Sequence, residues 1–146
     1  MKLSKVIFVF LLILMGSSKL FAWPPGSDKE KIMSILRYQE SAWNNSNIDS
    51  FMLFYWNSPE LRFVSKNGIR KGWQEVYDNY RQSNLSKGST GTLTYSVTSL
   101  DMINSSNALL IGTWIIRNNT GAYKGNFTLW VKKINRKWLI ILDHTS

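Results

Sequence analysis

The second half of the chain most constrains its fold, because four apolar segments follow one another there with only short polar turns between them. The segments are residues 92–102, 108–117, 126–134 and 138–144. Asn, Ser and Gly are frequent in the turns, and these residues favour tight reversals of the chain. Consecutive strands joined by short turns predict an antiparallel meander. The first segment alternates apolar residues with Thr and Ser. The later segments are apolar on both faces and should therefore lie centrally in the sheet.

Helical patterns precede this sheet. Ser27 and Glu30 have the spacing of a capping box, in which each side chain satisfies the other residue's backbone N–H group. Apolar residues then recur at helical spacing over residues 32–43, which predicts an amphipathic helix. A second helix is expected over residues 48–56, with Asn47 as its N-terminal cap.

A short hairpin should separate these helices from a third one. Residues 61–65 alternate as a strand does, and Asn67-Gly68 is a strong signal for a tight reversal. Residues 69–71 would form the returning strand, and Gly72 would open the third helix. Helices first and a long sheet afterwards predict an α+β fold, with about three N-terminal helices packed on one face of a curved, mainly antiparallel sheet.

The first 22 residues read as a secretory signal peptide. Lys2 and Lys5 precede an uninterrupted apolar run at residues 6–15, and small residues lead to Ala22. A retained membrane anchor is the alternative, but a helix needs roughly 20 apolar residues to span a bilayer. The chain has no cysteine for a lipid anchor. We therefore expect cleavage after Ala22, a single domain over residues 23–146, a secreted or periplasmic location and no stable membrane anchor.

The charge of the chain does not indicate nucleic-acid binding. The whole sequence has 18 basic and 9 acidic residues, and three of the basic ones precede Trp23. The remaining 15 basic against 9 acidic residues leave a formal charge of +6. Only the pairs at 70–71, 132–133 and 136–137 are clustered, whereas a nucleic-acid interface requires a basic patch or stripe. We expect a solvated basic surface, with attraction to anionic lipid or polymer surfaces left open.

The residue inventory also argues against several kinds of site. One histidine and no cysteine are too few to build a zinc site, and no carboxylate cluster has the spacing of a calcium loop. No glycine-rich phosphate loop and no nucleophile elbow are present. The sequence therefore predicts neither a metal nor a cofactor.

His144, the only histidine, is the first candidate for a functional side chain. In a regular final strand it shares a face with Trp138 and Leu142, whereas Asp143 points to the opposite face. His144 would then sit at the mouth of a pocket as a proton shuttle or hydrogen-bond donor. The alternative is a histidine that only fastens the end of the strand. Asp49 is either a first-turn helix carboxylate or a pocket acid near His144.

Aromatic residues are the second candidate group, with seven Trp, seven Phe and six Tyr in the chain. Rings with a few polar tips suit a flat or ring-bearing small molecule. The residues expected around such a cavity are Tyr55, Trp73, Tyr77, Tyr80, Trp114 and Trp130. Packing in the core is the alternative for each of them, and we assign Trp138 to packing outright.

Several short motifs together resemble the nuclear transport factor 2-like superfamily, and more narrowly its SnoaL-like, ketosteroid isomerase-like branch. They are Tyr38 to Trp43, Asn47 to Phe51, Tyr55-Trp56, Leu61 to Phe63, Gly72-Trp73, Gly112 to Trp114, Gly125 to Trp130 and Trp138 to Ser146. The resemblance implies a cone-shaped α+β domain with a pocket at its open end, often dimeric through the outer sheet face. The fold hosts isomerases, cyclases, dehydratases, binding modules and assembly domains, so it does not fix an activity.

Three functional hypotheses follow. The first is an exported domain that binds a small, partly apolar molecule in an aromatic-lined pocket with His144 at its rim. The second is a proton-transfer enzyme (isomerase, dehydratase or cyclase) with His144 as base and Tyr55 or Asp49 assisting. The third is a non-catalytic module that dimerises through its sheet and serves a larger assembly.

Overall fold

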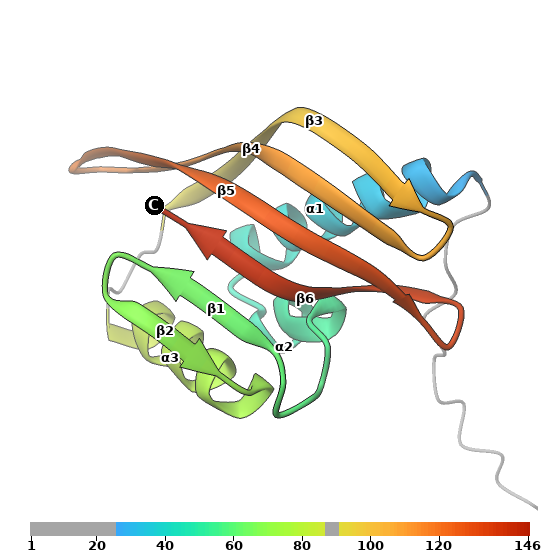
Figure 1. Cartoon of the computed structure of the whole chain (residues 1–146). Coiled ribbons are helices and arrows are strands. Elements are labelled where there is room, and N and C mark those ends of the chain that lie inside the picture. The colour runs from blue at the N-terminus through green and yellow to red at the C-terminus, as the bar shows by residue number, and fades with distance from the viewer. Residues whose placement is uncertain (1–25, 87–90) are drawn as a thin grey trace, which may run out of the picture.

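A computed structural model describes residues 26–86 and 91–146. The predicted signal peptide and the leader before Gly26 lie outside the described residues. The elements are α1 (Asp28–Asn44), α2 (Ile48–Phe51), a 3-10 turn (Met52–Phe54), β1 (Arg62–Ser65), β2 (Gly68–Lys71), α3 (Trp73–Ser86), β3 (Thr92–Asn104), β4 (Asn107–Asn118), β5 (Gly121–Ile134) and β6 (Lys137–Thr145). Figure 1 shows the helices gathered behind one face of a curved sheet.

The six strands form one sheet in the order β2-β1-β6-β5-β4-β3. Strands β3 to β6 pair with their sequence neighbours in antiparallel register, as the meander pattern predicts. The hairpin β1–β2 joins the same sheet because β1 pairs with β6 in parallel. The α+β fold class with helices on one face of a mainly antiparallel sheet is therefore confirmed.

Helix α1 begins at the capping box that the sequence predicts. The backbone N–H of Glu30 donates to Ser27 Oγ at 3.3 Å, and the N–H of Ser27 donates to Glu30 Oε2 at 2.6 Å. The inward face of the helix buries the apolar side chains of the predicted stripe, including Ile32, Ile35 and Leu36. Their burial against the sheet supplies the main attachment of α1.

The second helix is shorter than the sequence predicts. Helix α2 ends at Phe51, a 3-10 turn follows, and Tyr55 is already extended, whereas helix was expected as far as Trp56. The reason is competition from the sheet. Tyr55 pairs with Ile140 of β6, and the N–H of Trp56 donates to the Ile140 carbonyl at 2.9 Å. These contacts hold the backbone in an extended conformation that a helix does not allow.

Strand β5 begins earlier than the sequence predicts. Residues 118–125 contain many polar residues and were expected to be a turn, but pairing with β4 continues as far as Asn118 and Gly121. The turn is therefore only two residues long. Residues 121–124 (Gly-Ala-Tyr-Lys) are exposed and include no large aliphatic side chain, which is compatible with a strand that projects into solvent.

Polar side chains of α1 fasten the helix to the free edge of β3. Asn44 bonds both backbone groups of Leu93, accepting from its N–H at 2.7 Å and donating to its carbonyl at 3.1 Å. Glu40 accepts a hydrogen bond from the N–H of Tyr95. Because an uncovered strand edge invites pairing with other chains, these bonds protect the edge as well as position the helix.

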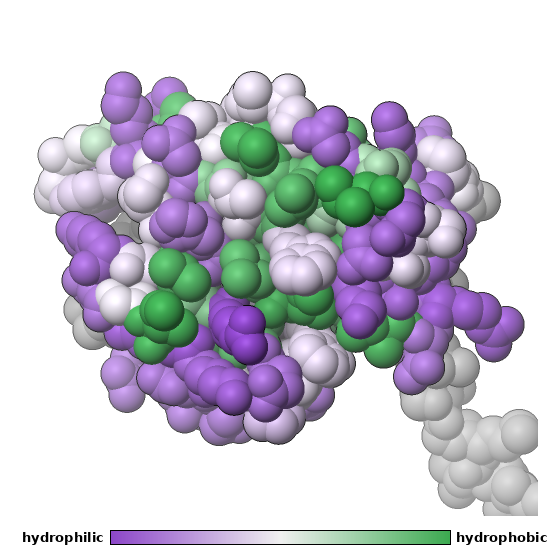
Figure 2. Space-filling view, viewed as in Figure 1, coloured by the Kyte–Doolittle hydropathy of each residue, from purple (hydrophilic) through white to green (hydrophobic). Residues whose placement is uncertain are grey.

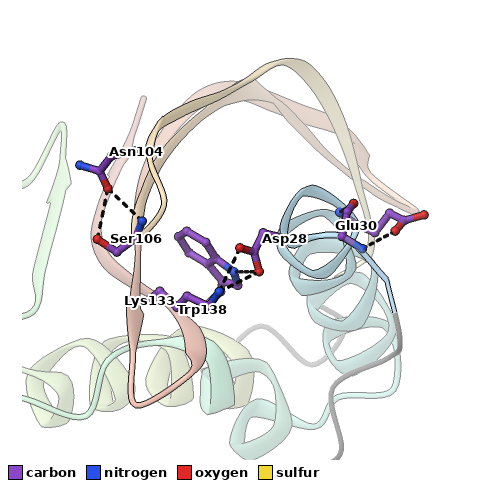
Figure 3. A network of polar contacts seen from close by, with 7 residues as sticks. Asp28, Glu30, Asn104, Ser106, Lys133 and Trp138 are labelled. Atoms are coloured by element: carbon purple, nitrogen blue, oxygen red, sulfur yellow. Dashed lines mark hydrogen bonds and ion pairs between the residues drawn. The ribbon is translucent and has the colours of Figure 1, made fainter.

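At the opposite end of α1, Asp28 joins the helix to β5 and β6 (Figure 3). Its carboxylate accepts from Trp138 Nε1 at 3.0 Å and from Lys133 Nζ at 3.0 Å. The Lys133 ammonium also lies 5.6 Å from the centre of the Trp138 ring. Trp138 is 1% exposed, so its assignment to core packing is confirmed.

None of the helices in residues 26–86 and 91–146 is long and apolar enough to cross a membrane.

We expect Trp138→Ala to lower the free energy of unfolding by about 3–5 kcal/mol, because it removes a buried ring and leaves a cavity. Trp138→Phe should cost less, since it keeps most of the apolar contact and loses the hydrogen bond to Asp28. Urea denaturation measures both. Tyr123→Ala is the aromatic control, because Tyr123 is 57% exposed. A midpoint for Trp138→Ala equal to that of Tyr123→Ala would contradict the prediction.

Candidate functional site

A β-bulge in β6 determines which side chains enter the interior of the fold. On β5, Trp130 pairs with Leu142 and Val131 pairs with Ile140, so Ile141 is an extra residue with no partner. A bulge of this kind shifts the inward and outward alternation by one position. Before it, Trp138 and Ile140 face inward at 1% and 0% exposure; after it, Asp143 faces inward at 5% exposure. His144 consequently points outward and is exposed.

The inward side chains surround a cavity of about 160 Å³ between the helices and the sheet. Fourteen described residues line it; eight of them carry aromatic rings, and Asp143 is the one among them with a carboxylate. The lining consists of Gln39, Trp43, Phe51, Tyr55, Phe63, Tyr80, Leu93, Tyr95, Trp114, Ile116, Phe127, Leu129, Asp143 and Thr145. A cavity of about 150 Å³ is large enough to hold benzene. The site therefore suits a molecule of about that size.

Two tyrosines form a hydrogen-bonded chain that ends on Asp143. Tyr55 Oη donates to Asp143 Oδ2 at 2.6 Å, and the hydroxyls of Tyr55 and Tyr80 lie 3.3 Å apart. When Asp143 is ionised, the Tyr55 hydrogen is committed to the carboxylate, so Tyr80 supplies the hydrogen of the second bond. The other oxygen, Asp143 Oδ1, is buried and has no hydrogen-bond partner within the described part of the chain.

Burial raises the pKa of Asp143 to about 6, although the hydrogen bond from Tyr55 acts in the opposite direction. The titratable groups facing Asp143 are the hydroxyls of Tyr55, Tyr80 and Tyr95. Burial and the charge of Asp143 raise the pKa of all three hydroxyls, so each stays neutral at physiological pH. The interior of the cavity thus holds one group that changes charge near neutrality.

Two glycines make room for the rings on the sheet side of the cavity. A Cβ atom at Gly112 would lie 2.6 Å from the Phe127 ring, and one at Gly125 would lie 2.7 Å from the Trp114 ring. Both distances are shorter than normal carbon contacts. Trp114 Nε1 donates to Thr145 Oγ1 at 2.8 Å, which fixes the orientation of the indole. The local pattern of Gly followed two residues later by an aromatic residue therefore builds part of the wall.

Three of the six aromatic residues predicted for the cavity line it: Tyr55, Tyr80 and Trp114. The other three do not. Trp73 and Tyr77 stack on each other outside the cavity, with ring centres 5.0 Å apart. Trp130 is 43% exposed and lies on the outer face of the sheet, because it alternates with the inward-facing Leu129 and Val131.

The placement predicted for His144 is wrong, because it assumed a regular final strand and the bulge at Ile141 reverses the alternation. His144 lies on the outer face, where it pairs with Val64 and Thr128. Asp49 does not lie near the cavity. It is exposed and accepts a hydrogen bond from Tyr77 Oη at 2.7 Å, so it is the first-turn carboxylate of α2 rather than a pocket acid.

Sequence reasoning missed Asp143 as the polar centre of the cavity, and it also missed Trp43, Tyr95 and Phe127 in the wall. The bulge has no clear marker in the run from Leu139 to Leu142, which is apolar throughout. Tyr95 and Phe127 could have been found from the alternation of their strands, since their ring centres lie 5.4 Å apart on the inner face.

Within residues 26–86 and 91–146, no group of three or more His, Asp or Glu side chains could hold a metal ion.

An open curved sheet wrapped around helices, with a cavity between the two layers, defines a cone-shaped α+β class of protein. A crystal structure from Shewanella oneidensis, an NTF-2 like protein of unknown function, superposes with a TM-score of 0.79. It is 32% identical in sequence, over 82% of this chain and 99% of the other. The chain belongs to the nuclear transport factor 2-like superfamily.

More distant structures share the fold. A domain of unknown function with a cystatin-like fold from Nostoc punctiforme is 19% identical and has a TM-score of 0.72. The match covers 84% of this chain and 78% of the Nostoc chain. An NTF2-like superfamily protein from Salmonella enterica is also 19% identical, with coverages of 81% and 89% and a TM-score of 0.65. No family model and no curated protein matches the sequence. Assignment to the SnoaL-like branch stays a prediction, since these relatives are described only as NTF2-like or cystatin-like.

The raised pKa of Asp143 predicts a specific pH dependence of stability. Between pH 4 and 6 the folded protein keeps a proton on Asp143 that the unfolded chain has released, so the free energy of unfolding falls as pH rises and levels off above pH 6. The fall attributable to this group is about 3 kcal/mol at most. Asp28 and Glu30, whose pKa values are lowered, act at and below the lower end of this range and with the opposite sign.

Denaturation of the wild type and Asp143→Asn from pH 4 to pH 8 isolates the contribution of Asp143. The asparagine keeps the shape of the protonated acid and does not titrate. We expect the variant to gain stability relative to the wild type as pH rises towards 7. Parallel curves for the two proteins would show that Asp143 is not buried as described.

Proposed function

We propose that this domain binds a small, partly apolar molecule in the aromatic cavity, with a hydrogen-bond donor of the ligand on Asp143 Oδ1. The single observation that supports this is the buried, unpartnered carboxylate oxygen in an otherwise largely apolar cavity. A buried polar atom without a partner costs about 1–3 kcal/mol. A ligand that supplies the missing donor would recover that free energy.

The rest of the lining supports the same proposal. Aromatic walls with a few convergent polar groups are typical of small-molecule sites. Trp43, Phe51 and Tyr80 hold one another in edge-to-face contacts, with ring centres between 4.9 and 6.4 Å apart. Such a preformed wall loses little conformational freedom when a ligand binds.

Proton transfer is the second candidate function, and Asp143 rather than His144 would perform it. A carboxylate with a pKa of about 6 and one free oxygen is suited to accept a proton from a bound molecule. Tyr55 would stabilise the carboxylate through its hydrogen bond, and Tyr80 would support Tyr55. His144 would take no part, because its side chain lies outside the cavity.

Three probes of benzene-like size test the binding proposal: benzyl alcohol, phenol and benzylammonium. We expect at least one to quench the fluorescence of Trp43 and Trp114, which line the cavity. Leu93→Phe should weaken that probe at least tenfold, because the larger ring occupies the cavity. His144→Asn is the control on the outer face and should change nothing. If no probe binds, or if Leu93→Phe binds as the wild type does, the proposal fails.

We further propose that the outer face of the sheet pairs with a second copy of the chain. Figure 2 shows an apolar region on that face, and its exposed members include Ile111 and Trp130, each 43% exposed. Leu109, Trp130 and Leu142 lie side by side across β4, β5 and β6. An exposed apolar patch of this kind suits a symmetric dimer, in which each copy contributes the same surface, and the superfamily resemblance points to the same face. The third hypothesis, an assembly module, would use this same surface.

We also propose export to the periplasm or medium, on the basis of the first 22 residues. A basic start, a short apolar run and small residues before Trp23 support cleavage there. The proposal includes no nucleic-acid partner, because the basic residues are scattered along the sequence rather than gathered in one tract.

A native mass spectrum of the full-length gene product, expressed in a bacterium, tests both proposals. We expect a subunit that begins at Trp23 and a dimer of that subunit. Trp130→Glu should yield monomers, because it places a charge in the centre of the patch. Tyr123→Glu should remain dimeric, since Tyr123 is an exposed aromatic residue near the end of the β4–β5 hairpin. A monomeric wild type would rule out the dimer, and an uncleaved subunit would rule out processing at Ala22.

A further inference from the structure

The cavity contains a negative charge that no positively charged side chain among its described lining residues balances. Asp143 is 5% exposed, its Oδ2 accepts from Tyr55, and its Oδ1 has no partner in the described part of the chain. No Lys, Arg or His occurs among the described residues that line the cavity. The neighbours of Asp143 in the sheet are Phe63 and Leu129, so the positions paired with it supply no compensating charge.

The walls of the cavity add to this negative character. The face of an aromatic ring carries partial negative charge and attracts cations within about 6 Å of its centre. Phe51, Tyr55 and Tyr80 form one connected group of rings, and Tyr55 is also bonded to the carboxylate. Tyr95 and Phe127 contribute rings from the sheet side. A carboxylate surrounded by aromatic rings is a suitable environment for an organic ammonium group.

A further carboxylate lies close to the wall of the cavity. Glu40 accepts a hydrogen bond from the backbone N–H of Tyr95, and its charge contributes to the raised pKa of the Tyr95 hydroxyl. The negative charges of Asp143 and Glu40 therefore both raise the pKa of the Tyr95 hydroxyl. The basic excess of the chain does not counter this inside the cavity, because its lining contains no described basic residue.

We propose that the ligand of this cavity is a small organic cation: a benzene-sized molecule whose ammonium group lies at Asp143 Oδ1 and whose apolar part contacts the rings. The inference rests on the proposed binding function and specifies its ligand class. A neutral alcohol would satisfy the free oxygen but leave the charge uncompensated. An anion would be repelled by Asp143, since no cation in the described lining offsets the carboxylate.

Benzylammonium and benzyl alcohol form a matched pair for the test, because they have nearly the same size and shape and both donate hydrogen bonds. Calorimetric titration at pH 7.5 should show benzylammonium binding at least tenfold more tightly. Asp143→Asn should remove that preference by weakening benzylammonium at least tenfold, with benzyl alcohol changed by less than threefold. His144→Asn, one residue away on the outer face, should keep the wild-type preference, and thermal melting confirms that both variants are folded.

The pH dependence supplies a second readout. Benzylammonium should bind more tightly as pH rises from 5 to 7, because Asp143 loses its proton in this range, while the facing hydroxyls of Tyr55, Tyr80 and Tyr95 stay neutral. Benzyl alcohol should show no such increase. Equal or tighter binding of benzyl alcohol by the wild type would overturn the cation proposal and leave the binding function intact. Failure of both probes and phenol to bind would overturn the binding function as well.

Discussion

The extra residue in β6 is the constraint on which the chemistry of this molecule depends. Ile141 has no partner on β5, and its insertion turns Asp143 inward and His144 outward. The other edge of β6 accommodates the bulge, because the partner segments change at this point: Tyr55 and Trp56 bond Ile140, whereas β1 pairs from Leu142 onward. Bulges are frequent beside functional sites because they redirect a side chain without breaking the sheet.

The same region of β6 brings Asp143, Tyr55 and Tyr80 together in one hydrogen-bonded chain. Tyr55 is extended because it pairs with β6, and this pairing places its hydroxyl against Asp143 three residues beyond Ile140. Tyr80 arrives from α3 and bonds the Tyr55 hydroxyl. The shortened α2 and the bulged β6 therefore have a common structural result. Each departs from its regular pattern, and together they bury a carboxylate beside two tyrosines.

The regular elements of the fold could be predicted from the sequence, because their signals are local. The capping box at Ser27 and Glu30, the hairpin at Asn67-Gly68 and the meander after residue 91 each depend on neighbouring residues. The parallel pairing of β1 with β6 could not be predicted in this way, since it joins segments about 80 residues apart in the sequence. Tyr55 and Tyr80 were predicted for the cavity, but the functional side chain of the final strand was predicted to be His144 at the rim, whereas Asp143 is the one bonded to Tyr55.

The misplacement of His144 marks the limit of assigning strand faces by alternation. Alternation along a strand assigns faces correctly only while every residue has a partner, and the apolar run from Leu139 to Leu142 gives no sign of an unpaired one. On β5 alternation alone would have assigned the faces correctly, although Trp130 was predicted to line the cavity. Phe127, Leu129 and Val131 are all buried, while Trp130 between them is exposed. A functional side chain that follows a bulge is therefore harder to identify from sequence than one on a regular strand.

Asp143 is an unfavourable residue for stability at this position, and this argues for a role other than packing. Taking an ionised carboxylate out of water is costly unless charges or hydrogen bonds compensate it. Here one hydrogen bond from Tyr55 is the only compensation within the described residues, and the pKa remains raised to about 6. An apolar residue of similar size would avoid that cost among the surrounding rings. Local violations of this kind are expected at functional sites, and the partner missing from Asp143 Oδ1 is the one that a bound molecule would provide.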